Sequence, residues 1–505
     1  MKVIVSIVGI AIAIAAWQFR VHFPFDDTFI SFRYAEHVAS GYGLVWNIGG
    51  PNTEGFTNLL FVLLLAAARF VTSDLLTVSQ ILGLAFTIAT GLIIFSITTD
   101  VRDKKAGLLA LAVYWITPLT WINAMSGMET SLFVMLCALA ILLAIRNQCF
   151  AAFAAAFLAT LTRPEGVLLG VIVFIVAVGF DPLSRGSILR ILKGTATKAA
   201  FAFLIALALY TLWKWWYFGE LLPNSFYVKV LANTPAVFPG LQYVRLFVGS
   251  SLVLVALSFG IRGWKNAAVP MVAAWAVLLL AFYSFVLPLE GLYDRFLWPA
   301  FSMLCITAAI GARDFAARRK LRPFIVFAVI ALGMHFTLSM LSPRTKQSFA
   351  AHEEIWDASM DRIVTELRML PHMDSVLLAY GDAGYVVYKS GIHHIDLFGL
   401  NDTRIAHANT VAMRESIVQS ERPDILLLPI YSRDSCEDFV EDAYGLARTK
   451  EFESVASTGA FPFRLVWLLN IESPYYTDCK REILQRIKDS TSSLDPAPRL
   501  CYSTR

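Results

Sequence analysis

The chain has few charged residues for its length. Only 16% of its 505 residues are Asp, Glu, Lys or Arg, whereas 57% are hydrophobic, and the mean hydropathy is +0.62. A soluble globular domain has about 25% charged residues, so this balance excludes an ordinary soluble protein. The net charge of +4 is small and its sign says little, so we expect no nucleic-acid partner.

Several functional motifs are also absent from the sequence. It has no glycine-rich phosphate loop, which argues against a nucleotide-dependent enzyme. Its six cysteines form no CxxC or Cys/His cluster, and His393 and His394 have no third ligand at zinc spacing. We expect the cysteines in apolar runs to be packing residues. In the polar tail, a disulfide between Cys436 and Cys479 is an open alternative if the tail faces an oxidising compartment.

Long apolar runs fill the first two thirds of the chain. A membrane-crossing helix needs about 20 apolar residues, and the runs predict about eleven spans. These are residues 3–19, 76–98, 106–122, 130–146, 150–162, 166–180, 199–217, 243–261, 266–286, 296–312 and 323–341. The run at 57–71 is shorter, and we expect an interfacial or re-entrant helix there. A cleaved signal peptide is the alternative for the first run.

The positions of Lys and Arg predict the topology. If 57–71 stays on the outer surface, all the basic loops fall on one side, which the positive-inside rule makes cytoplasmic. These loops are 102–105, 185–198, 262–265 and 313–322. The N-terminus is then cytoplasmic and the C-terminus lies outside. The chain is thus predicted to be an α-helical polytopic membrane protein.

The composition becomes polar after residue 341. The segments "SVLLAY", "YVVYKSG", "HHIDLFG" and "DILLLPI" are typical of strands, and "EEIWDASMDRIVTELRML" is typical of a helix. We therefore predict a transmembrane domain over 1–341 and an extracytoplasmic α/β domain over 342–505.

The predicted outer loops contain an unusual set of acids and bases. Asp26 and Asp27 follow the first apolar run, where charges are unfavourable unless they meet water, a partner or a ligand. Two carboxylates can share one proton, or one can act as a base while the other orients it. Lys229, Arg163 and Arg295 can hold a phosphate. Further candidates for binding the donor or its sugar are Glu54, Asn58, Glu129, Asn224 and Tyr227. This set fits transfer of a group from a lipid-linked phosphate to an acceptor hydroxyl.

Each candidate also has a structural interpretation. Adjacent aspartates are frequent at helix N-caps, and Arg163 can pair with Glu165. Lys229 and Arg295 can extend to the membrane surface. Helix capping is the alternative for Glu54, Asn58 and Glu129.

Several segments resemble the C-superfamily (GT-C) of polyprenyl-phosphate-dependent glycosyltransferases. They are "DDTFISFRYAEHVASGYGLVWNIGGPNTEGFTN" (26–58), "GMETSLF" (127–133), "LTRPEG" (161–166), "LPNSFYVK" (222–229), "DRFLWPA" (294–300) and "GDAGYVVYKSGIHHIDLFGLND" (381–402). The resemblance covers nearly the whole chain and is nearest to the bacterial terminal β-arabinofuranosyltransferases. Its most specific parts are the first and the last of these segments. The chain is shorter than those enzymes and has "GGPNTEGFTN" where "GERVEGYTN" is expected, which leaves the donor and acceptor open.

The resemblance implies an enzyme of the bacterial inner membrane that takes a sugar from a polyprenyl-phosphate donor. It implies arabinofuranose as the sugar, a glycan, lipid or protein of the cell envelope as the acceptor, and Asp26 and Asp27 in the active site. No cofactor is expected to be required, although a divalent cation held by Asp26, Asp27 and Glu54 is an open alternative. The rival interpretations are a transporter or flippase of a lipid-linked sugar and a non-catalytic envelope assembly protein.

Overall fold

The computed structural model of the protein describes residues 2–18, 24–180, 194–228, 238–261, 268–286, 294–317, 334, 360–430, 438–439, 452–458, 464–489, 494–496 and 500–501. The chain divides into two compact units. The helical unit comprises Met1–Pro24, Thr57–Leu221 and Thr234–Phe349, and the α/β unit comprises Phe25–Phe56, Leu222–Asn233 and Ala350–Arg505. The division predicted at residue 342 places Phe25–Phe56 with the membrane domain, whereas in the structure this first loop packs with the tail.

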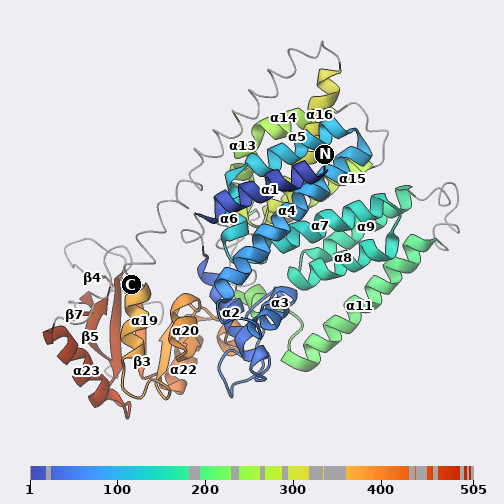
Figure 1. The fold of residues 1–505 in the computed structure, drawn as a ribbon. Helices are drawn as coiled ribbons and strands as arrows, with labels where there is room; N and C mark the ends of the chain where they lie inside the picture. Colours follow the sequence, from blue (N-terminus) through green and yellow to red (C-terminus); the bar gives the residue numbers. More distant parts are fainter. Residues whose placement is uncertain are drawn as a thin grey trace. The chain divides into compact units, whose positions relative to one another are not determined.

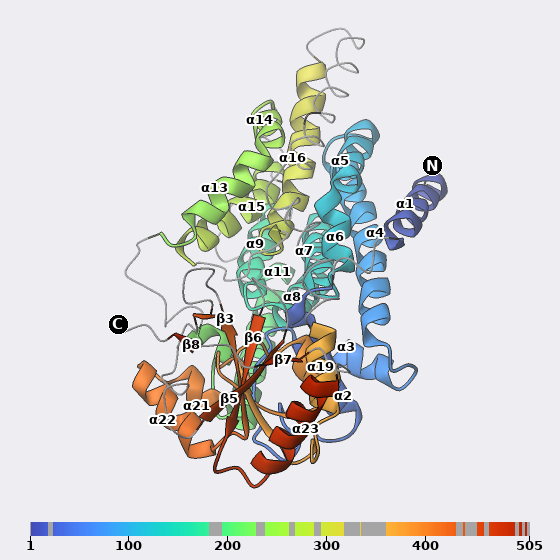
Figure 2. The same cartoon turned by 90° about the vertical axis from the view of Figure 1, so that its left-hand side faces the viewer.

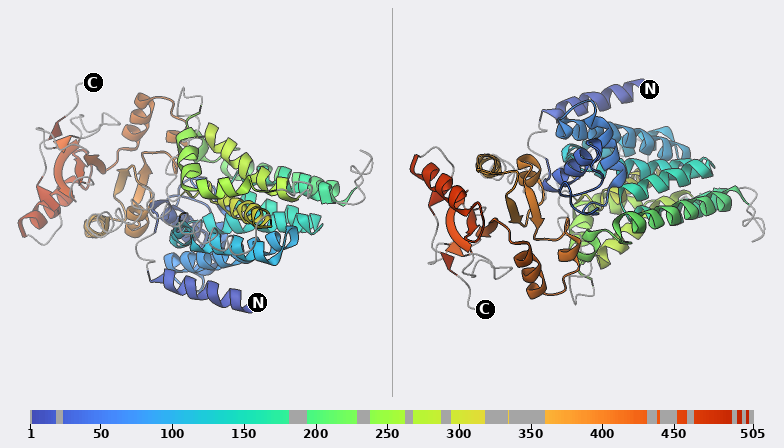
Figure 3. Two further views of the ribbon diagram at one scale, coloured as in Figure 1. Left: turned by 90° about the horizontal axis from the view of Figure 1, so that it is seen from above. Right: turned by 90° about the horizontal axis from the view of Figure 1, so that it is seen from below.

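The helical unit is built from apolar helices (Figure 1). In chain order they are α1 (Lys2–Trp17), α3 (Leu59–Arg69), α4 (Leu75–Val101), α5 (Lys104–Ile116), α6 (Pro118–Met125), α7 (Thr130–Ile145), α8 (Cys149–Thr162), α9 (Gly166–Phe180), α11 (Thr195–Phe218), α13 (Leu241–Ser250), α14 (Leu252–Ser258), α15 (Ala268–Phe285) and α16 (Trp298–Ala316). Helices α7, α8 and α9 pack side by side, and α13 to α16 form a neighbouring group (Figure 2). Seen from above and from below, α1 lies at the edge of the helical unit, next to α4 (Figure 3).

Two described helices, α4 and α11, are long and apolar enough to cross a membrane. The bent pairs α5–α6 and α13–α14 also qualify if each pair is one span, with bends of 60° and 78°. The first bend falls at Pro118, which lacks the backbone N–H needed to continue a helix, so the predicted span at 106–122 is broken there. The predicted span at 323–341 lies outside the described residues. The total of about eleven spans therefore stays a prediction.

Two further features agree with a membrane protein. Helix α11 exposes large apolar side chains, among them Leu209 at 62% and Trp216 at 78%, a surface that is stable against lipid but unfavourable in water. Helix α3 forms within the short run predicted at 57–71 and has 11 residues. It is roughly 16 Å long and cannot cross a hydrocarbon core of about 30 Å, as expected for an interfacial helix.

The α/β unit contains a six-stranded mixed sheet in the order β2-β1-β3-β6-β5-β7. The strands are β1 (Leu377–Tyr380), β2 (His393–Asp396), β3 (Ile425–Ile430), β5 (Phe452–Thr458), β6 (Arg464–Asn470) and β7 (Leu494–Pro496), with a separate pair of β4 (Asp438–Phe439) and β8 (Leu500–Cys501). The helices are α2 (Asp26–Ala39), α12 (Asn224–Phe226), α19 (Asp361–Arg368), α20 (Tyr385–Ser390), α21 (Thr403–Ala406), α22 (Val411–Glu421) and α23 (Tyr476–Asp489).

The parallel half of this sheet is formed by β2, β1 and β3. Strand β1 lies in the middle, and the chain reaches β2 through α20 and then β3 through α21 and α22. The direction of strand addition therefore reverses at β1. In open α/β sheets ligands bind beyond the carboxyl ends of the strands at such a reversal, so the turn after Tyr380 is a favourable place for a site.

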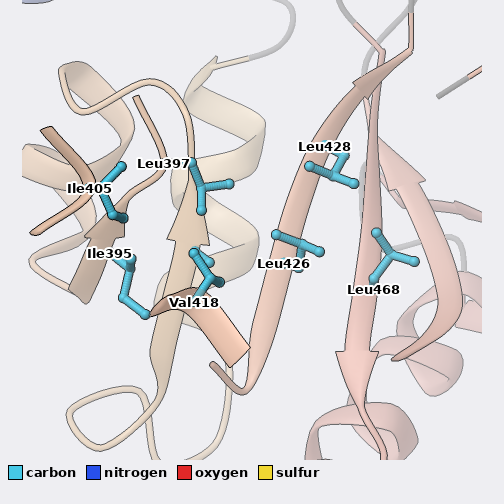
Figure 4. Close-up of a cluster of buried hydrophobic side chains, with 8 residues drawn as sticks. Ile395, Leu397, Ile405, Val418, Leu426, Leu428 and Leu468 are labelled. Atoms are coloured by element: carbon cyan, nitrogen blue, oxygen red, sulfur yellow. The ribbon is translucent and has the colours of Figure 1, made fainter. Parts of the chain in front are cut away.

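One face of the sheet is covered by a cluster of buried aliphatic side chains (Figure 4). It contains Ala379, Ile395, Leu397, Ile405, Val418, Leu426, Leu428 and Leu468. The registers align Ala379 with both Ile395 and Leu426, so these side chains share a face. Burial of each large aliphatic side chain contributes about 1.5–3 kcal/mol, which makes the strands a firm base for the turn that follows β1.

The tail confirms three of the strand predictions and contradicts one. The segments "SVLLAY", "HHIDLFG" and "DILLLPI" contain β1, β2 and β3. The segment "YVVYKSG" is helix α20, which ends at Gly391 in the left-handed conformation. Cys479 is a free thiol in the structure, and its suggested disulfide partner, Cys436, lies outside the described residues. Cys137, Cys149 and Cys305 are buried packing residues as expected.

Candidate active site

Asp26 and Asp27 form the first turn of α2, where negative charge is stabilised by the helix dipole. The N-cap is Phe25, and no side chain caps the helix, so the N-cap interpretation of the aspartates is wrong. The Asp26 Oδ1 atom accepts a hydrogen bond from the backbone N–H of Tyr385 at 2.8 Å. Gly384 is pressed against the same carboxylate, and a Cβ at this position would collide with it. The tail, rather than the aspartate's own helix, therefore holds Asp26.

Asp382 lies in the turn between β1 and α20 and was not predicted as a site residue. The Tyr380 hydroxyl donates to Asp382 Oδ2 at 3.0 Å. The surrounding protein raises the pKa of the Asp382 carboxyl, Tyr380 opposes the rise, and the negative charge of Asp27 adds to it. Burial is the largest cause of this rise in pKa, although the Asp382 side chain keeps contact with solvent, and the charge of Asp27 is a smaller cause.

Arg33 anchors the first loop to the tail. Its guanidinium donates to the carbonyl oxygens of Trp46 at 2.8 Å, Val387 at 2.9 Å and Ile392 at 3.0 Å. It also lies over the Trp46 ring, 4.7 Å from the centroid. Burial lowers the pKa of Arg33 to about 10, so the group stays charged at neutral pH. Val387 belongs to α20, and this contact helps to fix α20 next to α2 (Figure 1).

His394 completes the same contact. Trp46 Nε1 donates to His394 Nδ1 at 3.2 Å, and His394 Nε2 lies 2.9 Å from the Tyr380 carbonyl oxygen. Nδ1 accepts, so Nε2 carries the proton of a neutral ring. Burial lowers the pKa of His394 to about 3. His394 is thus a buried structural residue, whereas His393 is exposed.

A buried carboxylate, Asp396, organises the loop after β2. It accepts from the backbone N–H groups of Phe398, Gly399 and Asn401 and from the Asn401 side chain at 2.8 to 3.1 Å. Burial raises the pKa of Asp396 to about 6, although these hydrogen bonds oppose the rise. The Asn401 Oδ1 atom accepts from the Tyr34 hydroxyl of α2 at 3.1 Å, so this loop also binds the first loop.

Three other predicted site residues lie in the same unit. The Asn224 backbone N–H donates to the Glu54 carbonyl oxygen at 3.1 Å, and its side chain donates to the Leu400 carbonyl oxygen at 3.1 Å. Tyr227 stacks against His407 with ring centroids 4.1 Å apart. These contacts fix the segment after residue 221 against the tail. Lys229 lies outside the described residues.

The helical unit holds a second group, which we call the arginine cluster: the predicted site residues Asn58, Glu129 and Arg163 together with Glu165 and Tyr283. The Arg163 Nε atom is 3.0 Å from Glu165 Oε1 and 3.7 Å from Glu129 Oε1. Tyr283 donates to Glu165 at 2.5 Å, and Asn58 Nδ2 donates to Glu129 Oε2 at 3.0 Å. All five side chains come from different helices or their ends, so the cluster ties those helices together.

The arginine cluster decides between several earlier alternatives. Asn58 and Glu129 occupy N-cap positions but make no side-chain cap bond, so the capping interpretation of both is wrong. Arg163 pairs with Glu165, as its structural interpretation predicted. Arg295 is buried, its carbonyl oxygen accepts from Arg163 at 3.3 Å, and its guanidinium lies over Phe296. It does not extend to the surface.

The predicted residues thus fall into two sets, one in each unit. Asp26, Asp27, Glu54, Asn224 and Tyr227 belong to the α/β unit, and Asn58, Glu129, Arg163 and Arg295 belong to the helical unit. Asp382, Arg33 and Asp396 were missed, although they lie in the two segments with the most specific resemblance. Among the residues that the structure describes, no three His, Cys, Asp or Glu side chains are grouped to hold a metal ion.

Comparisons with known proteins identify the fold. No curated protein matches the chain, and one family model, "Domain of unknown function (DUF8728)", matches residues 354–471. The oligosaccharyltransferase of Archaeoglobus fulgidus in its apo form is similar, with a TM-score of 0.57, 12% identity, and coverage of 95% of this chain and 78% of that chain. ArnT from Cupriavidus metallidurans bound to undecaprenyl phosphate has a TM-score of 0.59, 14% identity, and coverage of 92% and 98%.

A third structure, AglB from Archaeoglobus fulgidus with an inhibitory peptide and a dolichol-phosphate, has a TM-score of 0.54 at 12% identity, over 94% of this chain and 77% of that chain. At such identities the likeness establishes a shared fold. This chain has the fold of the Archaeoglobus fulgidus oligosaccharyltransferase and of ArnT, and it agrees in outline with the predicted helical fold that ends in an α/β region.

Proposed function

We propose that the protein is a membrane glycosyltransferase that moves a sugar from a polyprenyl-phosphate donor to an acceptor hydroxyl. The observation that carries the proposal is the pair of aspartates at the start of α2, of which Asp26 binds the segment after β1, in a chain with this fold. ArnT was captured with undecaprenyl phosphate and AglB with dolichol-phosphate, which supports a lipid-linked phosphate as the donor.

The reaction needs one base and one stabiliser of the leaving group. Asp26 or Asp27 takes the proton from the acceptor hydroxyl while its oxygen attacks the anomeric carbon of the sugar. The bond between that carbon and the phosphate oxygen breaks, and its electron pair leaves with the polyprenyl phosphate. Lys229 and Arg295 are our candidates for holding this phosphate.

The remaining predicted residues have supporting roles in this proposal. Arg163 is committed to two carboxylates, which suits it to positioning helix ends better than to direct contact with phosphate. Glu54, Asn58, Asn224, Tyr227 and Glu129 are proposed to shape the donor and sugar pocket. The sequence resemblance suggests arabinofuranose as the sugar and a cell-envelope glycan, lipid or protein as the acceptor. We place the reaction at the outer face of the bacterial inner membrane, with the tail on the extracytoplasmic side. A divalent cation that helps to bind the donor phosphate is the open alternative.

A transfer assay tests the proposal. Purified protein in detergent receives a panel of polyprenyl-phosphate sugars, including polyprenyl-phosphate arabinofuranose, with simple glycan acceptors, and released polyprenyl phosphate is measured by mass spectrometry. We expect turnover of one donor and a loss of about 10²-fold or more in Asp27→Asn, because a general base contributes about 10²–10⁴-fold. The control is Asp374→Asn, an exposed aspartate between α19 and β1. Folded protein that turns over no donor, or an Asp27→Asn variant with full activity, would contradict the proposal.

A further inference from the structure

The turn between β1 and α20 contributes to the same site as the first-loop aspartates. Tyr380 ends β1, and Tyr385 begins α20, so the turn comprises only 381–384. Its last residue, Gly384, abuts the Asp26 carboxylate, and Tyr385 donates to Asp26. Residues more than 350 positions apart are thus in direct contact at the carboxyl end of β1.

Asp26 is poorly arranged to be the chemical partner of Asp27. Its Oδ1 is used by the Tyr385 N–H, and Gly384 packs against Oδ2. Residues i and i+1 of a helix also do not face each other, so two adjacent aspartates of α2 point in different directions. Asp26 has the contacts of a residue that fastens α2 to the tail.

Asp382 has the opposite set of properties. Its side chain keeps contact with solvent, and the Tyr380 hydroxyl fixes one carboxylate oxygen. It lies three residues before Tyr385, and its carboxyl responds to the charge of Asp27. It also sits at the point of strand reversal, where α/β sheets place their ligands.

We propose that Asp382 of the tail, rather than Asp26, is the second carboxyl of the active-site pair and positions the proton that Asp27 takes from the acceptor. This inference rests on the proposed function. In the resting state the two carboxyls share one proton, because the charge of each one disfavours ionisation of the other. During transfer the acceptor proton goes to Asp27, and Asp382 helps to hold it until it is released to water. Asp382 acts through Asp27 and is a positioning residue.

The other ionisable groups around the pair do not replace Asp382. On α2 these are Asp26, which binds the tail backbone, and Arg33, whose contacts lie at Trp46, Val387 and Ile392. On α19, Asp361 accepts from the Tyr385 hydroxyl. On α20, Lys389 lies over the Tyr385 and Tyr388 rings, and Tyr388 donates to Glu36. Each of these has a structural contact of its own.

The test reads the protonation of Asp27 directly, without requiring turnover. A hydrophobic carbodiimide modifies protonated carboxyls, and mass spectrometry of the full-length protein's peptides gives the labelling of Asp27 at each pH. We expect Asp382→Asn to move the labelling midpoint of Asp27 to lower pH by about one unit, because the like charge is removed. Asp26→Asn should move it less, and Asp374→Asn should not move it.

A gentler variant keeps the test informative if Asp382→Asn folds poorly. Tyr380→Phe removes the hydroxyl that favours the charged form of Asp382, so we expect a smaller shift of the Asp27 midpoint in the same direction. An unchanged midpoint in both variants, or a larger shift in Asp26→Asn, overturns the inference.

The transfer assay, run on the same samples, separates this inference from the proposed function. If the Asp382→Asn variant shifts the labelling midpoint of Asp27 but the wild type turns over no donor, the carboxyl pair is supported and the proposed glycosyltransferase activity is contradicted. Turnover with no midpoint shift keeps the enzyme and rejects the pair. If turnover and the midpoint shift are both observed, the transfer rate of Asp382→Asn should fall at a lower pH than that of the wild type, by the same amount as the labelling midpoint of Asp27 shifts. A purely structural role of Asp382 would not cause this change.

Discussion

The helical unit and the α/β unit differ in how their charged side chains are arranged. The helical unit contains the arginine cluster, and the α/β unit contains an acidic site with Asp27 and Asp382. In the arginine cluster, Arg163 lies beside Glu129 and Glu165. Asn58 donates to the second oxygen of Glu129, and Tyr283 donates to the same Glu165 oxygen that Arg163 contacts. In the acidic site, the negative charge of Asp27 raises the pKa of a second carboxyl, Asp382, and both side chains keep some contact with solvent. Opposite charges neutralise one another, and removing one of them destabilises the structure. Like charges compete for a proton, so they can take part in proton transfer.

The first loop contains charged residues of both kinds. Its charged residues divide between the two roles. Arg33 is fully engaged by backbone carbonyls and by Trp46, and Asp26 by the backbone of the tail. The charge of Asp27, in contrast, raises the pKa of another carboxyl, Asp382. Adjacency in sequence therefore says little about shared function here.

The largest expected effect follows from breaking the arginine cluster. Arg163→Met leaves Glu129 and Glu165 buried without their counter-charge, which should lower the free energy of unfolding by about 3–5 kcal/mol. Thermal unfolding in detergent, followed by tryptophan fluorescence, measures this. Arg146→Met is the matched control, because its ion pair with Asp100 is partly exposed and should contribute less than about 1 kcal/mol. Equal effects of the two variants would contradict the structural role of the cluster.

A smaller loss is expected at the anchor of the first loop. Arg33→Lys keeps the positive charge but loses the planar fork that reaches several carbonyls, which should cost about 2 kcal/mol. The control is Arg481→Lys, whose side chain is 74% exposed. If Arg33→Lys unfolds at the same temperature as this control, the guanidinium does not hold the loop to the tail.

The smallest effect concerns acid stability and depends on pH. As pH falls below 6.5 the unfolded chain protonates His394, but the folded state does so only near pH 3, so His394 destabilises the fold over that window. Asp396 acts oppositely: its folded pKa of about 6 exceeds its ordinary value of 3.8, so it adds stability as pH falls between them. Between about pH 6 and pH 3.8, where both groups contribute, the two effects nearly cancel in the wild type.

Removing the titration of His394 should reveal the effect of Asp396 on the pH dependence of stability. His394→Gln keeps polar atoms for Trp46 and Tyr380 but cannot be protonated, so its stability relative to the wild type should rise as pH falls from 6.5, by about 1 kcal/mol for each pH unit. Unfolding temperatures measured across this pH window check it. A difference between variant and wild type that is the same at every pH would contradict the buried, neutral state of His394.

Much of the fold could be predicted from apolar patterning. Helices α4 and α11 and strands β1, β2 and β3 fall where continuous or alternating apolar residues indicate them. The predicted span at 106–122 is not one continuous helix, because Pro118 begins a second helix and the pair α5–α6 is bent by 60°. The segment 385–390 has the composition of a strand, but the glycines on either side and the contacts of Val387 with Arg33 make it a helix.

The site could be predicted only in part. Asp26 and Asp27 were found because charge next to an apolar run is unusual. Asp382 follows an ordinary strand, and its significance comes from contacts with residues far away in the sequence, which local patterning cannot show. Its place within the segment that most specifically resembles the glycosyltransferases was the signal that could have indicated it.

The central claim is that the acidic site does chemistry and the arginine cluster holds the structure. The most direct measurement is donor turnover and unfolding temperature in the same preparations of wild type, Asp27→Asn and Arg163→Met. The account predicts that Asp27→Asn loses turnover at an unchanged unfolding temperature and that Arg163→Met loses stability. An Asp27→Asn variant that is active but unstable, or an Arg163→Met variant that is stable but inactive, would contradict it.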